Sequence, residues 1–413
     1  MKQRNYIFSL SIIGILYFTF GFITWLNNQL IPFLKTACQL TDTNAYLVTF
    51  AFYISYFVMA LPSASILKRT GFARGISLGL VVMALGCLIF IPAAQSRNYV
   101  VFLIGLFVQG TGLALLQTAA NPYVTVLGPI ESATQRMCIM GLFNKIAGII
   151  GIWIFSKALL SNFDSVTHEI EMATGTNQVY LLDSLASRIV LPYIIMACAL
   201  VLIAIMVHLA KLPNINSTED SLSSNNGNKT TLPAYLWLGV LALFFYEGAE
   251  VMAIDTLVPY SKSIGLPDTI YSRTGIFALL ALLIGYISTI IAIPKYISQR
   301  KALAMCSILS LAFVTISLFS NGIMSLVFII LLSFSNAVMW GAIWALAIDK
   351  LGERTSYASA LLIMAIVGGA IIPLLYGKLS EVMASTQFAY LLFIPCYAFV
   401  LFYSLKGYKI GKN

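Results

Sequence analysis

The chain has 413 residues, of which 60% are hydrophobic and only 9% are charged, whereas an average soluble domain is roughly 25% charged. A water-soluble protein cannot bury that much apolar surface, so the composition excludes that class. The net charge of +9 does not indicate nucleic-acid binding, because the basic residues are spread thinly between apolar runs, as in an ordinary membrane protein. The six cysteines are scattered without metal-ligand spacing, and we expect no cofactor and no bound metal.

Apolar runs long enough to cross a bilayer recur along the whole chain. A transmembrane helix needs ~20 mostly apolar residues, so these runs predict an all-α polytopic membrane protein with twelve transmembrane helices. The first run is too long for the apolar part of a cleavable signal peptide. The predicted spans are 6–33, 44–67, 76–94, 99–124, 137–160, 189–210, 234–259, 270–294, 302–320, 322–348, 356–378 and 387–405.

A polar stretch rich in Ser and Asn, residues 214–231, divides the spans into two sets of six. Such a composition predicts a flexible segment, so we predict six-helix bundles over 1–210 and 234–413 joined by a linker over 211–233. Sixteen Lys and Arg residues fall on the side of the N-terminus and seven on the other side. This bias predicts that both termini are cytoplasmic. Two pseudo-symmetric six-helix halves are typical of the major facilitator fold, which rocks about a central site.

Polar residues deep inside the spans are the candidates for a substrate site. Gln117 and Asn121 are four residues apart and therefore share a helix face, as do Asn336, Trp340 and Trp344. Amides supply the donors and acceptors that sugar hydroxyls need, and an indole packs on the apolar face of a pyranose ring. A single amide can instead join two helices, and a single Trp can be an interfacial anchor. The predicted sugar-binding residues are Trp25, Asn28, Gln117, Asn121, Asn144, Asn336, Trp340 and Trp344.

Three ionisable residues within the spans are the candidates for ion coupling: Glu247, Glu250 and Lys145. A charge at the centre of a span costs about 2.5–3.5 kcal/mol on the insertion scale, so such a residue usually faces a cavity or a partner. Glu247 and Glu250 share a face of the seventh span. A carboxyl group there can carry a proton, or it can bind Na+ with neighbouring carbonyls, most plausibly near Glu250. A Glu–Lys pair with only a structural role is the alternative.

Several strings resemble a known family over most of the chain. They are GFITWLNNQLIPFLK (21–35), AFYISYFVMALPSASILKRTGFARG (51–75), LLQTAANPYVTVLGP (115–129), GLFNKIAG (141–148) and MAIVGGAIIP (364–373). Together they closely resemble the fucose:proton symporter family of the major facilitator superfamily. Within it the chain is most similar to the glucose/galactose permease branch, which includes N-acetylglucosamine permeases of Gram-negative bacteria. The resemblance implies a monomer in lipid contact in a bacterial inner membrane.

The sequence departs from the fucose permeases at two positions. Those proteins carry acids, linked to proton coupling and sugar binding, where this chain has Asn28 and Gln117. An amide cannot carry a proton as a carboxylate does, so the resemblance implies coupling to Na+, coupling to protons through Glu247 or Glu250, or uncoupled transport.

The sequence therefore predicts a secondary transporter that imports glucose, galactose or an N-acetylhexosamine by alternating access. A fucose/proton symporter and a drug or metabolite exporter on the same fold are the alternatives, and a sugar sensor is a third. The chain shows no nucleophile–base arrangement or phosphate-binding loop, so we do not expect an enzyme.

Overall fold

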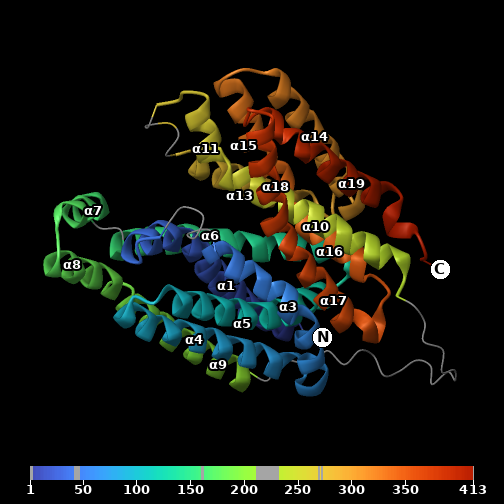
Figure 1. Cartoon of the computed structure of the whole chain (residues 1–413). Helices are drawn as coiled ribbons and strands as arrows, with labels where there is room; N and C mark the ends of the chain where they lie inside the picture. The colour runs from blue at the N-terminus through green and yellow to red at the C-terminus, as the bar shows by residue number, and fades with distance from the viewer. Residues whose placement is uncertain are drawn as a thin grey trace. The chain divides into compact units, whose positions relative to one another are not determined.

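The computed structural model describes residues 3–40, 47–159, 162–210, 232–267, 270 and 273–412, and every regular element in these ranges is helical (Figure 1). Hydrocarbon offers no water to backbone N–H and C=O groups, so the chain satisfies them within helices. Twelve helical stretches are long and apolar enough to cross a membrane. The prediction of an all-α protein with twelve transmembrane helices is confirmed.

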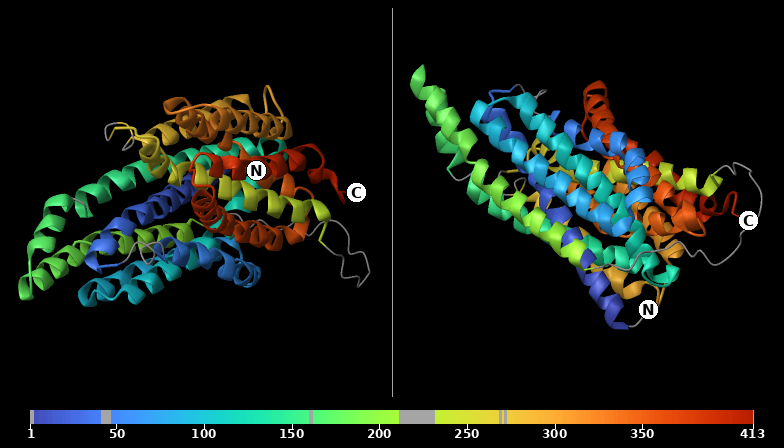
Figure 2. Two further views of the ribbon diagram at one scale, coloured as in Figure 1. Left: turned by 45° about the horizontal axis from the view of Figure 1, so that its top comes forward. Right: turned by 90° about the horizontal axis from the view of Figure 1, so that it is seen from below.

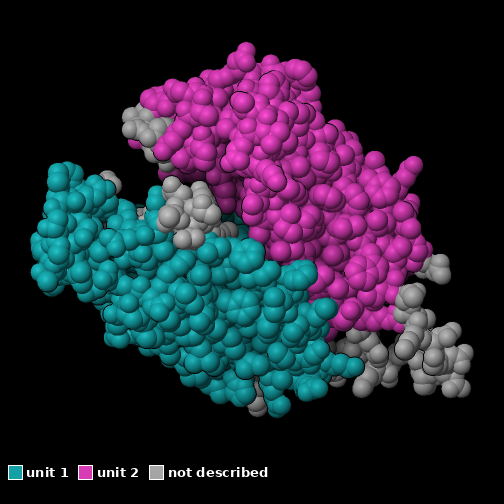
Figure 3. Space-filling model, in the orientation of Figure 1, with its two compact units in different colours: residues 1–120, 143–214 teal, residues 121–142, 215–413 magenta. Residues whose placement is uncertain are grey.

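The chain folds into two compact units, coloured separately in Figure 3. Unit 1 comprises residues 1–120 and 143–214. Its α4 packs along α9, and the two run side by side in Figures 1 and 2. The helices that lie wholly or partly in unit 1 are α1 (Gln3–Ala37), α3 (Leu47–Thr70), α4 (Phe72–Ser96), α5 (Tyr99–Val126), α6 (Ala133–Leu159), α7 (Phe163–Met172), α8 (Thr176–Ser187) and α9 (Val190–Leu209).

Unit 2 comprises residues 121–142 and 215–413. Within it α10 packs against α18 and α19, and α14 packs against α15 and α19. Its helices are α10 (Ala234–Asp255), α11 (Leu257–Ser263), α13 (Thr274–Ala292), α14 (Gln299–Phe319), α15 (Ile323–Asn336), α16 (Met339–Ile348), α17 (Thr355–Met364), α18 (Gly368–Val382) and α19 (Phe393–Leu405). Short 3-10 turns are η1 (Ile130–Ser132), η2 (Gly352–Arg354), η3 (Ala365–Val367), η4 (Phe388–Leu392) and η5 (Gly407–Lys409).

Two of the spans in unit 2 are broken helices. The predicted span 322–348 was expected to be continuous, but a turn at residues 337–338 separates α15 from α16. The span that contains the double glycine is interrupted by η3 just before Gly368. At Gly368 a side chain would collide with the backbone carbonyl of Phe244 on α10. The double glycine therefore lies at an interruption of the helix, and the missing side chain of Gly368 lets α10 approach closely.

The segment 121–142 belongs by sequence to the first predicted half but packs in unit 2. Thr134 donates to Gln299 Oε1 at 2.8 Å, and Gln135 Nε2 donates to the carbonyl of Ile290 at 2.7 Å. The two units thus differ from bundles over 1–210 and 234–413 by this segment. Of the predicted linker 211–233, residues 211–231 lie outside the described residues.

Arg136 holds the end of α5 to the start of α6. It directly precedes the predicted span 137–160, and in the structure it lies in α6 and is only 2% exposed. Its guanidinium donates to the carbonyls of Val124 at 2.8 Å and Thr125 at 2.6 Å, and to Ser132 Oγ at 2.6 Å. Carbonyls at the end of a helix lack intrahelical donors, and a cation there also complements the helix dipole. These bonds explain why a buried charge is tolerated.

Hydroxyl side chains inside the bundles bond in two ways. Many donate to the carbonyl one turn back, as Thr118 does to Ala114 at 2.7 Å, so a buried hydroxyl remains satisfied within its own helix. Others join helices: Ser310 pairs with Ser335 at 2.6 Å, and Ser317 pairs with Ser325 at 2.8 Å. These two pairs hold α14 against α15, as polar side chains commonly do between membrane helices.

The close approach at Gly368 gives a stability prediction. We expect Gly368→Ala to destabilise the protein by about 1–3 kcal/mol, the usual cost of overpacking, because the methyl group has no room beside the carbonyl of Phe244. Gly377→Ala is the matched control on the same helix, where a side chain meets nothing within 4 Å. Thermal unfolding of the detergent-solubilised variants measures both, and equal midpoints would contradict the packing role of Gly368.

Candidate functional site

In unit 1, three predicted site residues lie where α1 meets α6. The Lys145 ammonium sits over the indole of Trp25, with Nζ 4.7 Å from the ring centroid. Asn144 Nδ2 donates to the carbonyl of Tyr17 at 3.4 Å. The helices approach closely because Gly21 lies against the backbone of Asn144 and Gly148 lies against the Trp25 ring. The cation and the indole thus form a half-buried cation–π pair, an interaction worth about 0.5–2 kcal/mol.

Gln117 joins α5 to α3. Its Nε2 donates to the hydroxyl of Tyr56 at 3.2 Å, and Tyr56 is buried with its ring edge-on to Phe52. The sequence analysis did not select Tyr56, although a tyrosine deep inside a span is itself a polar signal. The side chain of Asn28, the remaining predicted residue of α1, lies outside the described residues.

Asn121 lies at the start of the α5 segment that belongs to unit 2. It is 1% exposed and its carbonyl accepts from Thr125 Oγ1 at 3.0 Å. Pro122 follows within the helix, and α5 runs on to Val126. Since proline lacks an N–H group, the carbonyl one turn earlier loses its usual donor. Asn121 thus lies next to a residue that cannot donate a backbone hydrogen bond.

The Asn336, Trp340 and Trp344 stripe crosses the break between α15 and α16. The two indoles stack with centroids 5.7 Å apart and an interplanar angle of 27°. Trp344 is fully buried and Trp340 is half-buried. Asn336 is also fully buried, and its Oδ1 accepts a hydrogen bond from the Tyr397 hydroxyl at 3.0 Å. The two indoles thus remain neighbours within α16, while Asn336 lies before the turn and bonds to Tyr397 on α19.

Glu250 lies on α10 in the same unit and is 8% exposed. The hydroxyl of Tyr246, one turn earlier, donates to its Oε2. The ring of Tyr246 in turn lies 6.5 Å from that of Trp340, so the carboxyl group and the indole stripe share a neighbour. Glu247 on α10 is half-buried. Sequence analysis missed Tyr246, although its four-residue spacing from Glu250 could have revealed the pair.

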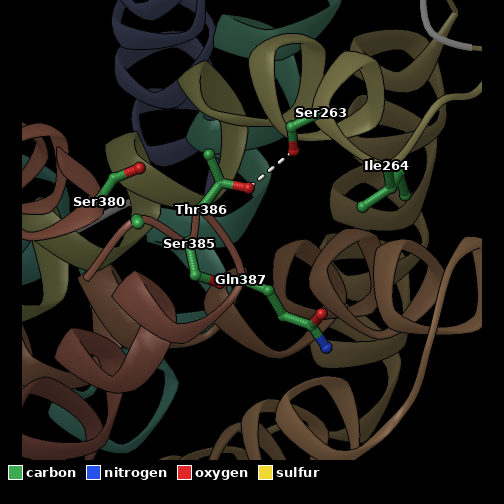
Figure 4. A pocket seen from close by; sticks show the side chains of 7 residues that line it. Ser263, Ile264, Ser380, Ser385, Thr386 and Gln387 are labelled. Atoms are coloured by element: carbon green, nitrogen blue, oxygen red, sulfur yellow. Dashed lines mark hydrogen bonds between the residues drawn. The ribbon is translucent and has the colours of Figure 1, made fainter.

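A separate recess of about 350 Å³ opens on unit 2 at the ends of α11 and α18 (Figure 4). It contains none of the predicted site residues. Its polar groups are bonded to each other or to the backbone: Ser263 pairs with Thr386 at 2.7 Å, and Gln387 donates to the carbonyls of Ser317 and Ser320. These bonds fix the turn that follows α18, and we assign the recess a structural role.

The sequence pattern of the Major Facilitator Superfamily matches residues 13–373 of this chain. This chain belongs to the Major Facilitator Superfamily. Two similar proteins extend over nearly its whole length. It is 34% identical over 412 residues to the glucose/galactose transporter of Brucella abortus (strain 9-941), covering 99% of this chain and 96% of that protein. It is 30% identical over 426 residues to the L-fucose-proton symporter of Escherichia coli (strain K12), covering 100% and 96%.

The crystal structure of the superfamily transporter FucP in the outward conformation has the same fold. It matches with a TM-score of 0.86 at 29% identity, over 97% of this chain and 98% of that chain. The predicted resemblance to the fucose symporter family and its glucose/galactose branch is therefore confirmed, as is the major facilitator fold. This member of the Major Facilitator Superfamily is a multi-pass membrane transporter.

Proposed function

We propose that this transporter imports a hexose, glucose or galactose, or an N-acetylhexosamine, by alternating access and with a coupling cation. The observation that carries this proposal is the full-length likeness to a glucose/galactose transporter. We further propose that it works as a monomer in a bacterial inner membrane with both termini in the cytoplasm, which agrees with the excess of Lys and Arg on that side.

The chemistry of the candidate residues supports a sugar as the substrate. Each unit offers amide groups close to aromatic rings: Gln117 beside Tyr56 in unit 1, and Asn336 one turn before Trp340 in unit 2. Amides match the mixed donors and acceptors of hydroxyl groups, while an indole face matches the apolar C–H face of a pyranose. A lipophilic substrate would leave the buried Nδ2 of Asn336, which has no partner among the described residues, without an acceptor, at a cost of about 1–3 kcal/mol.

The coupling cation is proposed to act at Glu250. The buried carboxyl group bonds to Tyr246, whose ring approaches Trp340, so a change in its charge acts directly on the neighbours of the indole stripe. A proton needs only the carboxyl group, whereas Na+ needs several oxygen ligands, to which nearby backbone carbonyls could contribute. Transport of L-fucose with a proton is the second candidate, and the likeness to the E. coli L-fucose-proton symporter favours it.

Counterflow tests the substrate. Purified protein in liposomes preloaded with unlabelled galactose should take up labelled galactose transiently above its equilibrium level, because exchange needs no ion gradient. The same measurement with glucose, N-acetylglucosamine or L-fucose as the unlabelled internal sugar then ranks these sugars as candidate substrates. Liposomes without protein are the control. Exchange of a lipophilic cation without exchange of any of these sugars would overturn the proposed function.

A substitution at Glu250 tests the coupling. Glu250→Gln keeps the shape and can still accept from Tyr246, but it cannot change charge. We expect it to lower gradient-driven accumulation at least about tenfold, since a tenfold ratio corresponds to 1.4 kcal/mol of lost driving energy, while counterflow persists. Glu247→Gln on the same helix is the comparison variant. Uptake driven by an imposed Na+ gradient or by an imposed proton gradient identifies the coupling ion. Unchanged gradient-driven sugar accumulation in Glu250→Gln would show that Glu250 has no role in coupling.

Tryptophan fluorescence tests the aromatic contact with the sugar. Trp340→Phe keeps an aromatic ring but loses the indole surface, so we expect a higher KM by a factor of about 2–10, the range that aromatic contacts of 0.5–1.5 kcal/mol give. The sugar-dependent change in emission should also disappear. Trp237→Phe replaces an indole that is 46% exposed on α10 and should keep both properties. If the sugar-dependent change in emission disappeared in Trp237→Phe but not in Trp340→Phe, the tryptophan that responds to sugar would be Trp237 and not Trp340.

A further inference from the structure

Tyr397 is a buried polar residue that the sequence analysis did not select. It lies on α19, is fully buried, and stacks on Phe393 with ring centroids 5.7 Å apart and an interplanar angle of 21°. Its hydroxyl donates to Oδ1 of Asn336 at 3.0 Å. The ring is thus held in place by its own helix, and its one polar atom is directed at a predicted sugar-binding amide.

This hydrogen bond determines what Asn336 can offer to a ligand. An asparagine side chain has an oxygen that accepts and an NH₂ group that donates. The Tyr397 hydroxyl donates a hydrogen bond to the amide oxygen. The buried Nδ2 has no hydrogen-bond partner among the residues that the structure describes. Buried donors in proteins nearly always have an acceptor. An unpartnered N–H in a candidate binding residue is therefore a donor that a ligand can satisfy.

A second donor on the same stripe has the same property. Nε1 of the fully buried Trp344 also lacks a hydrogen-bond partner within the described part of the chain, and an indole N–H can only donate. The carboxyl group of Glu250 on α10 accepts from Tyr246. The α15–α16 stripe therefore presents N–H groups, and its one amide oxygen is already bonded.

We propose that Tyr397 is a positioning residue that holds the Asn336 oxygen on its own hydroxyl and leaves Nδ2 for the substrate, so that this stripe recognises a hydrogen-bond acceptor on the substrate. This inference rests on the proposed function, in which the substrate is a sugar. The acceptor is a hydroxyl oxygen on the sugar ring. The substrate's own hydroxyl proton makes no contribution at that position.

Deoxy and deoxyfluoro sugars separate acceptor recognition from donor recognition. A C–F group accepts a hydrogen bond weakly and cannot donate, whereas a C–H group does neither. In the wild-type protein, inhibition of counterflow by analogues altered at each ring position should show one position that tolerates fluorine but rejects hydrogen. We expect the deoxy analogue to bind about tenfold more weakly there, the effect of an unpaired buried donor, while the fluoro analogue stays close to the parent sugar.

Tyr397→Phe should change this preference at the same position. The ring and its stacking remain, but the Asn336 oxygen loses its donor and can turn toward the substrate hydroxyl proton. The fluoro analogue should then bind about tenfold more weakly than the parent sugar, which corresponds to one lost hydrogen bond. Tyr403→Phe is the matched control, because that buried hydroxyl on α19 has no hydrogen-bond partner among the described residues. It should keep the wild-type ratio of the two analogues.

Two results would overturn the inference. One is that no ring position in the wild-type protein tolerates fluorine while rejecting hydrogen, a measurement that needs no variant to fold. The other is that Tyr397→Phe exchanges sugar with the same ratio as the wild type, which would leave Tyr397 with a packing role alone. Both differ from a failure of the proposed function, in which the parent sugars themselves show no counterflow.

Discussion

The structure depends on one constraint, which is that polar groups within the hydrocarbon must find partners inside the chain. The backbone meets it by forming helices. Thr118 meets it by bonding one turn back, and Ser310 meets it across two helices. Arg136 meets it with a set of carbonyls at the end of α5. The N–H groups of Asn336 and Trp344 are among the buried polar atoms in the described part of the chain that lack a partner, as is the Tyr403 hydroxyl. They differ from that hydroxyl because they belong to the candidate sugar-binding residues.

The sequence predicted the elements well and their interruptions poorly. Apolar runs determine which segments can cross a membrane, and all twelve predicted spans correspond to candidate spans of the structure. The break between α15 and α16 was missed because residues 337–338 are Ala and Val, which carry no turn signal. The prediction begins span 137–160 just after Arg136 because charged residues were treated as span boundaries, whereas α6 begins at Ala133 and the carbonyls at the end of α5 surround the charge.

In the candidate site, contacts between residues one helical turn apart could be predicted from the sequence, whereas contacts between residues far apart in the sequence could not. The pair of Tyr246 and Glu250 is one helical turn apart, so spacing alone could have predicted it. The pair of Tyr397 and Asn336 is 61 residues apart, and only the packing of α19 reveals it. Likewise, the pattern GLFNKIAG placed Lys145 inside a span, but it could not show that Trp25 lies beneath the cation. Residue types indicated the class of ligand, and tertiary contacts determine which atom of each residue faces a ligand.

At Gln117, an amide in place of a glutamate changes the direction of a hydrogen bond as well as the charge. A glutamate at this position would accept a hydrogen bond from the Tyr56 hydroxyl, because a carboxylate has no proton to donate. The amide does the opposite, since its Nε2 donates to that hydroxyl at 3.2 Å. The residue can keep the same place between α3 and α5 while the direction of the hydrogen bond reverses, and no step can load a proton on it. A proton-coupled cycle in this chain would therefore need another acid, and the buried carboxyl group of Glu250 shares its neighbour Tyr246 with the aromatic stripe of unit 2.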